Sequence, residues 1–150
     1  MIRLALTALA LIALASLGCA ETEQAPSTPA PIKTADVHTQ DEADAVAAET
    51  LFVSAWERRD EAQLGAALSA DWLRGSGQEW LTAFGGTASV RLVNLDVERS
   101  RPLPRGAVMV RATLDVTPAG GNSAWQHGPN ERVIQFVRED GAWKVAGIGG

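Results

Sequence analysis

Two residue types are scarce or missing in this chain of 150 residues, which has one cysteine, Cys19, and no tyrosine. A single cysteine excludes an intramolecular disulfide and any metal site built from several cysteines. Positive charge is also scarce, because 13 Lys and Arg stand against 18 Asp and Glu and give a net charge of −5. The composition therefore predicts no nucleic-acid footprint, and we expect neither a metal nor another cofactor.

The longest apolar run lies at the N-terminus, where Arg3 precedes residues 4–17 and the small residues Gly18 and Cys19 follow. A cation, a short apolar stretch and small residues in that order are typical of a signal peptide. The run is short for a bilayer span, which needs about 20 apolar residues. Residues 1–18 are therefore predicted to be a signal peptide rather than a retained membrane helix.

The sequence ASLGC at residues 15–19 resembles the lipobox of bacterial lipoprotein precursors, which ends in a small residue and an acylated cysteine. The resemblance implies that Cys19 is lipidated and holds the mature protein on a membrane through its acyl chains. Because Ala20 is not Asp, it also implies the periplasmic face of the outer membrane in a Gram-negative cell. Secretion without lipid and a retained helix are the alternatives.

Residues 19–38 carry few side chains that could be buried and include Pro26, Pro29 and Pro31 among Ser, Thr, Ala and acidic residues. Such a composition predicts a disordered tether. No polybasic segment follows Cys19, so attachment to a membrane must depend on the acyl chains themselves. The folded domain is expected to occupy residues 39–150.

Three helix starts are indicated by a capping residue that is followed three positions later by Glu or Gln. These pairs are Thr39 with Glu42, Asp60 with Gln63, and Ser76 with Glu79. After the first pair, apolar residues recur at spacings of three and four through residue 59, which predicts one buried face. Gly85 and Gly86 supply the conformation that ends a helix.

Beyond Gly86 the apolar period changes to two, which predicts four strands. Residues 88–99 change phase between Leu92 and Val93, and one extra residue in a β-bulge would explain that slip. Residues 108–117 alternate without interruption. Residues 131–138 and 143–148 flank Asp140 and Gly141, a pair that favours a tight hairpin.

The hairpin register predicts which side chains share a face. The face expected to be buried carries Ile134, Phe136, Trp143, Val145 and Gly147. The opposite face would carry Val133, Gln135, Val137, Lys144, Ala146 and Ile148. This second face is too apolar to be fully wetted, so an envelope protein or a second copy of the chain could cover it.

Three helices followed by four antiparallel strands predict an α+β domain, with N-terminal helices packed on a curved antiparallel sheet. The helical start at residues 43–68 and the ending QFVREDGAWKVAGI at residues 135–148 resemble the nuclear transport factor 2-like superfamily of cone-shaped domains. That family includes ketosteroid isomerases and polyketide cyclases. The resemblance implies a pocket between helices and sheet, which some members use for catalysis and others for binding or assembly.

Candidate pocket residues are an acid, several large aromatic residues and an amide. They are Asp71, Trp72, Trp80, Trp125 and Gln135. Desolvation inside a cone would raise the pKa of Asp71 for acid-base work, but a surface carboxylate is the simpler interpretation. Core packing likewise explains most of the tryptophans, and His38 and His127 lack the spacing of metal ligands.

The absence of tyrosine removes the usual oxyanion donor of the isomerases that the chain resembles. We therefore predict a noncatalytic domain on a lipid anchor, which binds a small apolar ligand or an envelope protein. The alternative is an isomerase or cyclase with Asp71 as base and a Trp ring N–H or Gln135 in place of the missing hydroxyl.

Overall fold

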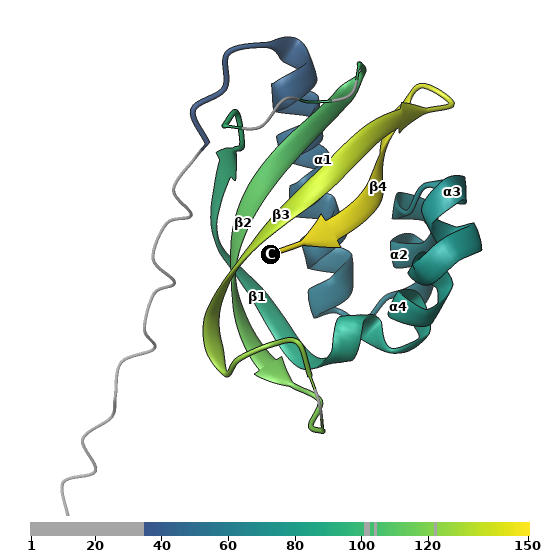
Figure 1. Cartoon of the computed structure of the whole chain (residues 1–150), viewed down its shortest axis with the longest axis vertical. Coiled ribbons are helices and arrows are strands. Elements are labelled where there is room, and N and C mark those ends of the chain that lie inside the picture. The colour runs from purple at the N-terminus through teal and green to yellow at the C-terminus, as the bar shows by residue number, and fades with distance from the viewer. Residues whose placement is uncertain (1–34, 101–102, 104, 122) are drawn as a thin grey trace, which may run out of the picture. The chain divides into compact units, whose positions relative to one another are not determined.

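A computed structural model describes residues 35–100, 103, 105–121 and 123–150. The predicted signal peptide, Cys19 and most of the predicted tether lie outside these residues. The described residues all belong to one compact unit. Its helices precede its strands along the chain, as the sequence predicts (Figure 1).

The helical part begins with the long helix α1, Gln40–Glu57. It continues with α2 (Glu61–Ala67), α3 (Ala70–Trp72), a π-helical turn (Leu73–Gly77), α4 (Gln78–Thr82) and a 3₁₀ turn (Phe84–Gly86). The four strands are β1 (Thr87–Val97), β2 (Ala107–Pro118), β3 (Gly128–Glu139) and β4 (Ala142–Gly149).

The first two predicted helix starts are confirmed. The Thr39 hydroxyl accepts from the Glu42 backbone N–H, and the Glu42 carboxylate accepts from the Thr39 N–H, which completes a capping box. Asp60 likewise accepts from the Gln63 N–H at 3.0 Å and opens α2. Local capping chemistry therefore fixes where α1 and α2 begin.

The third predicted helix start is wrong. Helical structure begins seven residues earlier, where the Ser69 hydroxyl caps α3 by accepting from the Trp72 N–H. Ser76 lies inside the π-helical turn and accepts instead from the Trp72 indole N–H at 3.0 Å. The Ser76 hydroxyl is therefore bonded to the Trp72 side chain, whereas the sequence pattern predicts that it caps a helix. Gly85 and Gly86 do end the helical part, at φ values of +63° and +74°.

The sheet has the order β1-β2-β3-β4, and every neighbouring pair is antiparallel. The β-bulge predicted in the first strand is confirmed, because Leu92 pairs with Leu114 whereas Asn94 pairs with Thr113. Val93 is the extra residue between them. The bulge keeps apolar residues of both phases on the buried side of β1.

The predicted hairpin is confirmed at its turn, where Arg138 pairs with Trp143 and Phe136 with Val145. A register shift follows, so that Gln135 pairs with Gly147 and Ile134 with Ile148. Gly147 therefore lies on the outer face and Ile148 packs against the core, the reverse of the sequence prediction. The extra residue in β4 could not be seen in the alternation, because both phases there are small or apolar.

Helix α1 packs across one face of the curved sheet, and α2, α3 and α4 lie together beside β4 (Figure 1). The edge of β4 is joined to this group where the Ser69 N–H donates to the Val145 carbonyl at 2.8 Å. The core between α1 and the sheet is dense. Its largest fully buried apolar side chains are Trp56, Phe52, Phe136, Leu64, Leu114, Ile134, Val53, Val110, Val116 and Val145.

Packing extends further toward the N-terminus than the sequence predicts. Ala35 is buried in the core cluster and Val37 packs against it, although both fall in the predicted tether. The Arg99 guanidinium also donates to the Asp36 carbonyl at 2.8 Å. Residues 35–38 therefore belong with the domain, because two apolar side chains and one arginine hold them there.

Candidate functional site

The aromatic candidates form one connected cluster beneath the short helices. Trp72 lies 5.6 Å from Trp80, Trp80 lies 4.8 Å from Trp56, and Trp56 lies 5.5 Å from Trp125, measured between ring centroids. Phe52 joins the cluster beside Trp56 and Trp80, at 5.8 and 5.6 Å. The rings pack against one another, so the cluster closes the end of the fold that carries the short helices.

Hydrogen bonds fix the two most deeply placed indoles. The Trp56 N–H donates to the Phe84 carbonyl at 2.9 Å and to the Thr87 hydroxyl at 3.0 Å. The Trp125 N–H donates to the Gly85 carbonyl at 2.6 Å. Gly85 is tightly enclosed, since a Cβ there would come within 2.7 Å of the Trp56 ring. These contacts use the indole N–H groups to anchor the chain at Phe84–Gly86.

Asp71 and Gln135 lie apart from the aromatic cluster. The Asp71 side chain is 90% exposed and forms an ion pair with Arg74, one turn further along. Gln135 lies on the outer face of the sheet, beside a hollow of about 260 Å³. That hollow is lined by Met109, Val133, Gln135, Gly147, Ile148 and Gly149. Of the five candidates, the structure therefore brings together only the three tryptophans.

One residue that the sequence analysis did not single out, Glu49, lies in the core. Its side chain is fully buried, and neither carboxyl oxygen has a hydrogen-bond partner among the described residues. Burial raises the pKa of this carboxyl to about 8, because surroundings without polar partners disfavour the charged form. Glu49 is therefore mainly protonated at neutral pH.

The helical period could have revealed Glu49. Ala45, Phe52, Val53 and Trp56 are buried along α1, and Glu49 lies one turn after Ala45 and one turn before Val53. An acid one turn from two residues of the apolar stripe lies on the stripe, so it faces the sheet when the stripe faces the sheet. The stripe predicted from the sequence contains only apolar positions and leaves this acid out.

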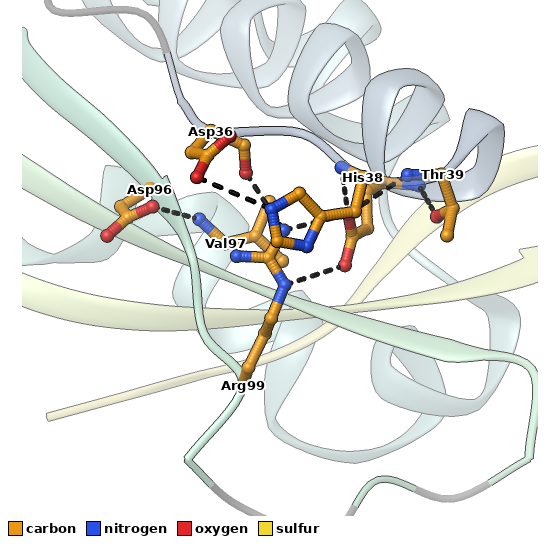
Figure 2. Close-up of polar contacts among 7 residues, drawn as sticks. Asp36, His38, Thr39, Asp96, Val97 and Arg99 are labelled. Carbon is orange, nitrogen blue, oxygen red and sulfur yellow. Dashed lines mark hydrogen bonds and ion pairs between the residues drawn. The ribbon is translucent and has the colours of Figure 1, made fainter.

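A second set of polar contacts joins the start of α1 to the end of β1 (Figure 2). The Arg99 guanidinium donates to both carboxylate oxygens of Glu42, at 3.0 and 2.8 Å. The same carboxylate accepts from the backbone N–H groups of His38 and Thr39. These contacts, led by the one from Arg99, lower the pKa of Glu42 to about 2. Glu42 is therefore ionised throughout the neutral range.

An apolar groove opens on the helical side, between α1, α2 and β4. It measures about 290 Å³ and is lined by Ala48, Leu51, Phe52, Ala55, Gln63, Ala66, Ala67 and Trp143. None of these side chains is charged, and Leu51 is 72% exposed. A large exposed aliphatic side chain beside an apolar hollow is a feature of ligand or partner sites.

The described residues contain no group of three or more His, Cys, Asp or Glu placed to hold a metal ion. His38 lies 3.4 Å from the Asp36 carboxylate at the start of α1, and His127 lines a polar hollow with Glu57 and Asp115. Among the same residues, no helix is both long enough and apolar enough to cross a bilayer.

No protein-family model matches this chain, and no curated protein matches its sequence. Solved structures do match its fold. A protein from Shewanella frigidimarina, assigned provisionally as a ketosteroid isomerase, aligns with a TM-score of 0.50 and 10% identity. The alignment covers 73% of this chain and 95% of that one.

Two further structures align with TM-scores of 0.48. One is a protein of the nuclear transport factor 2-like family from Streptomyces avermitilis, assigned provisionally as a dehydratase, with 16% identity over 71% of this chain and 91% of that one. The other is a nuclear transport factor 2-like protein of unknown function from Shewanella oneidensis, with 14% identity over 71% and 94%. The α+β cone fold predicted from the sequence is confirmed, and identities this low extend no further than the fold.

Proposed function

We propose that this chain is a lipid-anchored protein of the cell envelope, whose domain binds a small apolar ligand without transforming it. The apolar groove between α1, α2 and β4 is the observation that carries the binding role. The position of Asp71 supports the absence of catalysis, because an exposed acid paired with Arg74 has no enclosed surface to act on. The lipid anchor is inferred from the sequence around Cys19.

The anchor can be tested on the full chain expressed in a Gram-negative host. Mass spectrometry of the N-terminal peptide should find acyl chains on Cys19 and no residues before it, and the protein should fractionate with the outer membrane. The Cys19→Ala variant should lose both the modification and the membrane fractionation. An intact N-terminal Met, or a free thiol on the processed protein, would refute the anchor.

Binding in the groove can be tested by photolabelling the full chain with a decanol derivative that carries a diazirine. The label should fall on peptides that line the groove. Ala48→Trp should lower labelling at least about fivefold because the larger ring fills the groove, while Thr50→Trp, at an exposed position of α1 that does not line the groove, should leave labelling unchanged. Labelling spread evenly over the surface would contradict a binding role for the groove.

A protein partner on the outer face of the sheet is a second binding role that we propose. The hollow beside Gln135 supports it, because Gly147 and Gly149 leave the surface there without side chains. A second copy of the chain or another envelope protein could fill that hollow. Native mass spectrometry of the wild type and of Val133→Asp should show whether this face holds an assembly together.

An isomerase-like activity is the alternative function, and the buried carboxyl of Glu49 favours it over the Asp71 mechanism expected from the sequence. As a base, Glu49 would accept a proton from the carbon next to a carbonyl group and return it to another carbon of the substrate. The isomerase activity should rise as pH rises through 8, because only the ionised Glu49 carboxylate accepts a proton. Glu49→Gln should abolish deuterium exchange into a panel of ketones, and the absence of exchange in the wild type would exclude this activity for them.

A further inference from the structure

The rim of the apolar groove carries positive charge, although none of the groove's lining side chains is charged. Arg58 donates to the Gln63 side-chain oxygen at 3.0 Å, and Lys144 donates to the Ala66 carbonyl. Gln63 and Ala66 both line the groove. Each of these two cations therefore lies one hydrogen bond away from the wall of the groove.

Neither of these two cations is paired with an acid in the part of the chain that the structure describes. No carboxylate of the described residues forms a salt bridge with Arg58 or Lys144. A third cation, Arg138, lies 5.7 Å from the Trp143 ring centroid, but Asp41 pairs with it at 3.4 Å. Beyond the groove, Asp44 lies one turn before Ala48 and accepts from the Gln40 amide at 2.6 Å.

We propose that the groove binds a single-chain anionic amphiphile, namely a medium-chain aliphatic carboxylate. The alkyl chain lies against Leu51 and the Trp143 ring, and the carboxylate meets Arg58 or Lys144 at the rim. This inference rests on the proposed binding role and adds the chemical class of the ligand. A groove of about 290 Å³ has room for one flexible chain, whereas a membrane surface would need a broad apolar patch.

The side chains around the groove suit such a ligand. Contact with uncharged side chains contributes most of the binding free energy of an aliphatic chain, and the groove supplies such side chains along one side of α1. The carboxylate retains part of its contact with water, because Arg58 is exposed and Lys144 half-buried. Attraction at such a rim selects the sign of the ligand charge more than it adds affinity.

The test compares three diazirine probes with the same ten-carbon chain, ending in a carboxylate, a hydroxyl or an ammonium group. The full chain is held in nanodiscs of uncharged phosphatidylcholine, so that the lipid adds no preference of its own. The carboxylate should label groove peptides about threefold to tenfold more than the ammonium probe, with the alcohol between them. Unlabelled decanoate should compete with the carboxylate probe.

Variants separate the charge from the apolar contact. Arg58→Gln with Lys144→Gln should remove the preference for the carboxylate while the alcohol still labels the groove. Each single variant shows which end of the groove holds the carboxylate, and Arg105→Gln, at an exposed cation that does not line the groove, should change nothing. Circular dichroism checks that every variant is folded.

The outcomes distinguish this inference from the binding role on which it rests. Equal labelling of the groove by all three probes, or an unchanged preference in the double variant, would overturn the anionic ligand and leave the binding role standing. Failure of every probe, including the alcohol, to label the groove would overturn the binding role first and the charge preference with it.

Discussion

The two ends of α1 are held against the sheet by different interactions. At the N-terminal end, Arg99 pairs with Glu42 in a contact that solvent reaches, since 37% of the Arg99 side chain and 15% of the Glu42 side chain are exposed. At the C-terminal end, Trp56 is fully buried among aromatic rings and donates two hydrogen bonds. One helix thus depends on charge at its start and on packing at its end.

The two ends of α1 should therefore respond to different conditions. Salt screens exposed ion pairs, and acid removes the charge of a carboxylate. Neither condition directly affects a buried indole that packs on other rings. Glu49 lies between the two ends and is fully buried, so it adds a third response, to a rise in pH above about 4.5.

The largest loss is expected when the aromatic end is broken. Trp56→Ala should lower the free energy of unfolding by about 3–5 kcal/mol, because it leaves a cavity and removes the donor to Phe84 and Thr87. Denaturant titration measures the loss. Leu51→Ala on the exposed side of the same helix should change stability by less than about 0.5 kcal/mol. Similar losses in the two variants would contradict the packing account.

The next effect is a fall in stability with rising pH that originates at Glu49. Its pKa is about 8 in the folded protein, above the ordinary 4.5, so between these values the folded state holds a proton that the unfolded state has lost. Unfolding therefore becomes easier as pH rises, by about 3 kcal/mol between pH 5 and pH 7.5. Glu49→Gln should remove this slope, as denaturant titrations at several pH values would show. A slope that persists in the variant would assign the effect to another group.

The smallest effect is expected at the charged end. Glu42→Gln should cost about 1 kcal/mol at pH 7 in low salt, since solvent screens this pair, and less in high salt. Because the pKa of Glu42 is lowered to about 2, its contribution is present above pH 4.5 and disappears as pH falls toward 2. A double-mutant cycle with Arg99→Gln measures the coupling. A coupling energy that does not depend on salt would contradict an exposed ion pair.

Much of the fold could be predicted because its signals are local. Thr39 and Asp60 cap the helices that follow them, and Asp140 with Gly141 forms the predicted turn. The bulge in β1 was visible because the apolar phase changes there. The predictions were wrong where the local structure depends on a partner that the pattern does not reveal. The Ser76 hydroxyl accepts from the Trp72 indole N–H and caps no helix, and β4 contains an extra residue before Gly147.

The candidate site was harder to predict from the sequence. Asp71, Trp72 and Trp80 are close along the chain, but the two tryptophans turn into the aromatic cluster while Asp71 faces solvent. No residue type marks the groove, which arises where the small alanines of two helices meet the Trp143 ring. Its cations come from separate elements, and only the tertiary structure brings Arg58 and Lys144 to one rim.

The attachment of residues 35–38 to the domain has a mechanical consequence. If acyl chains on Cys19 hold the protein as proposed, any pull between the membrane and a bound partner enters the domain through this segment. The first described contact on the path of that load is the packing of Ala35 in the core, and the Arg99 hydrogen bonds to Asp36 and Glu42 follow directly behind it. A pull on the tether would therefore act on the core of the domain and on the ion pair together, rather than on a free end.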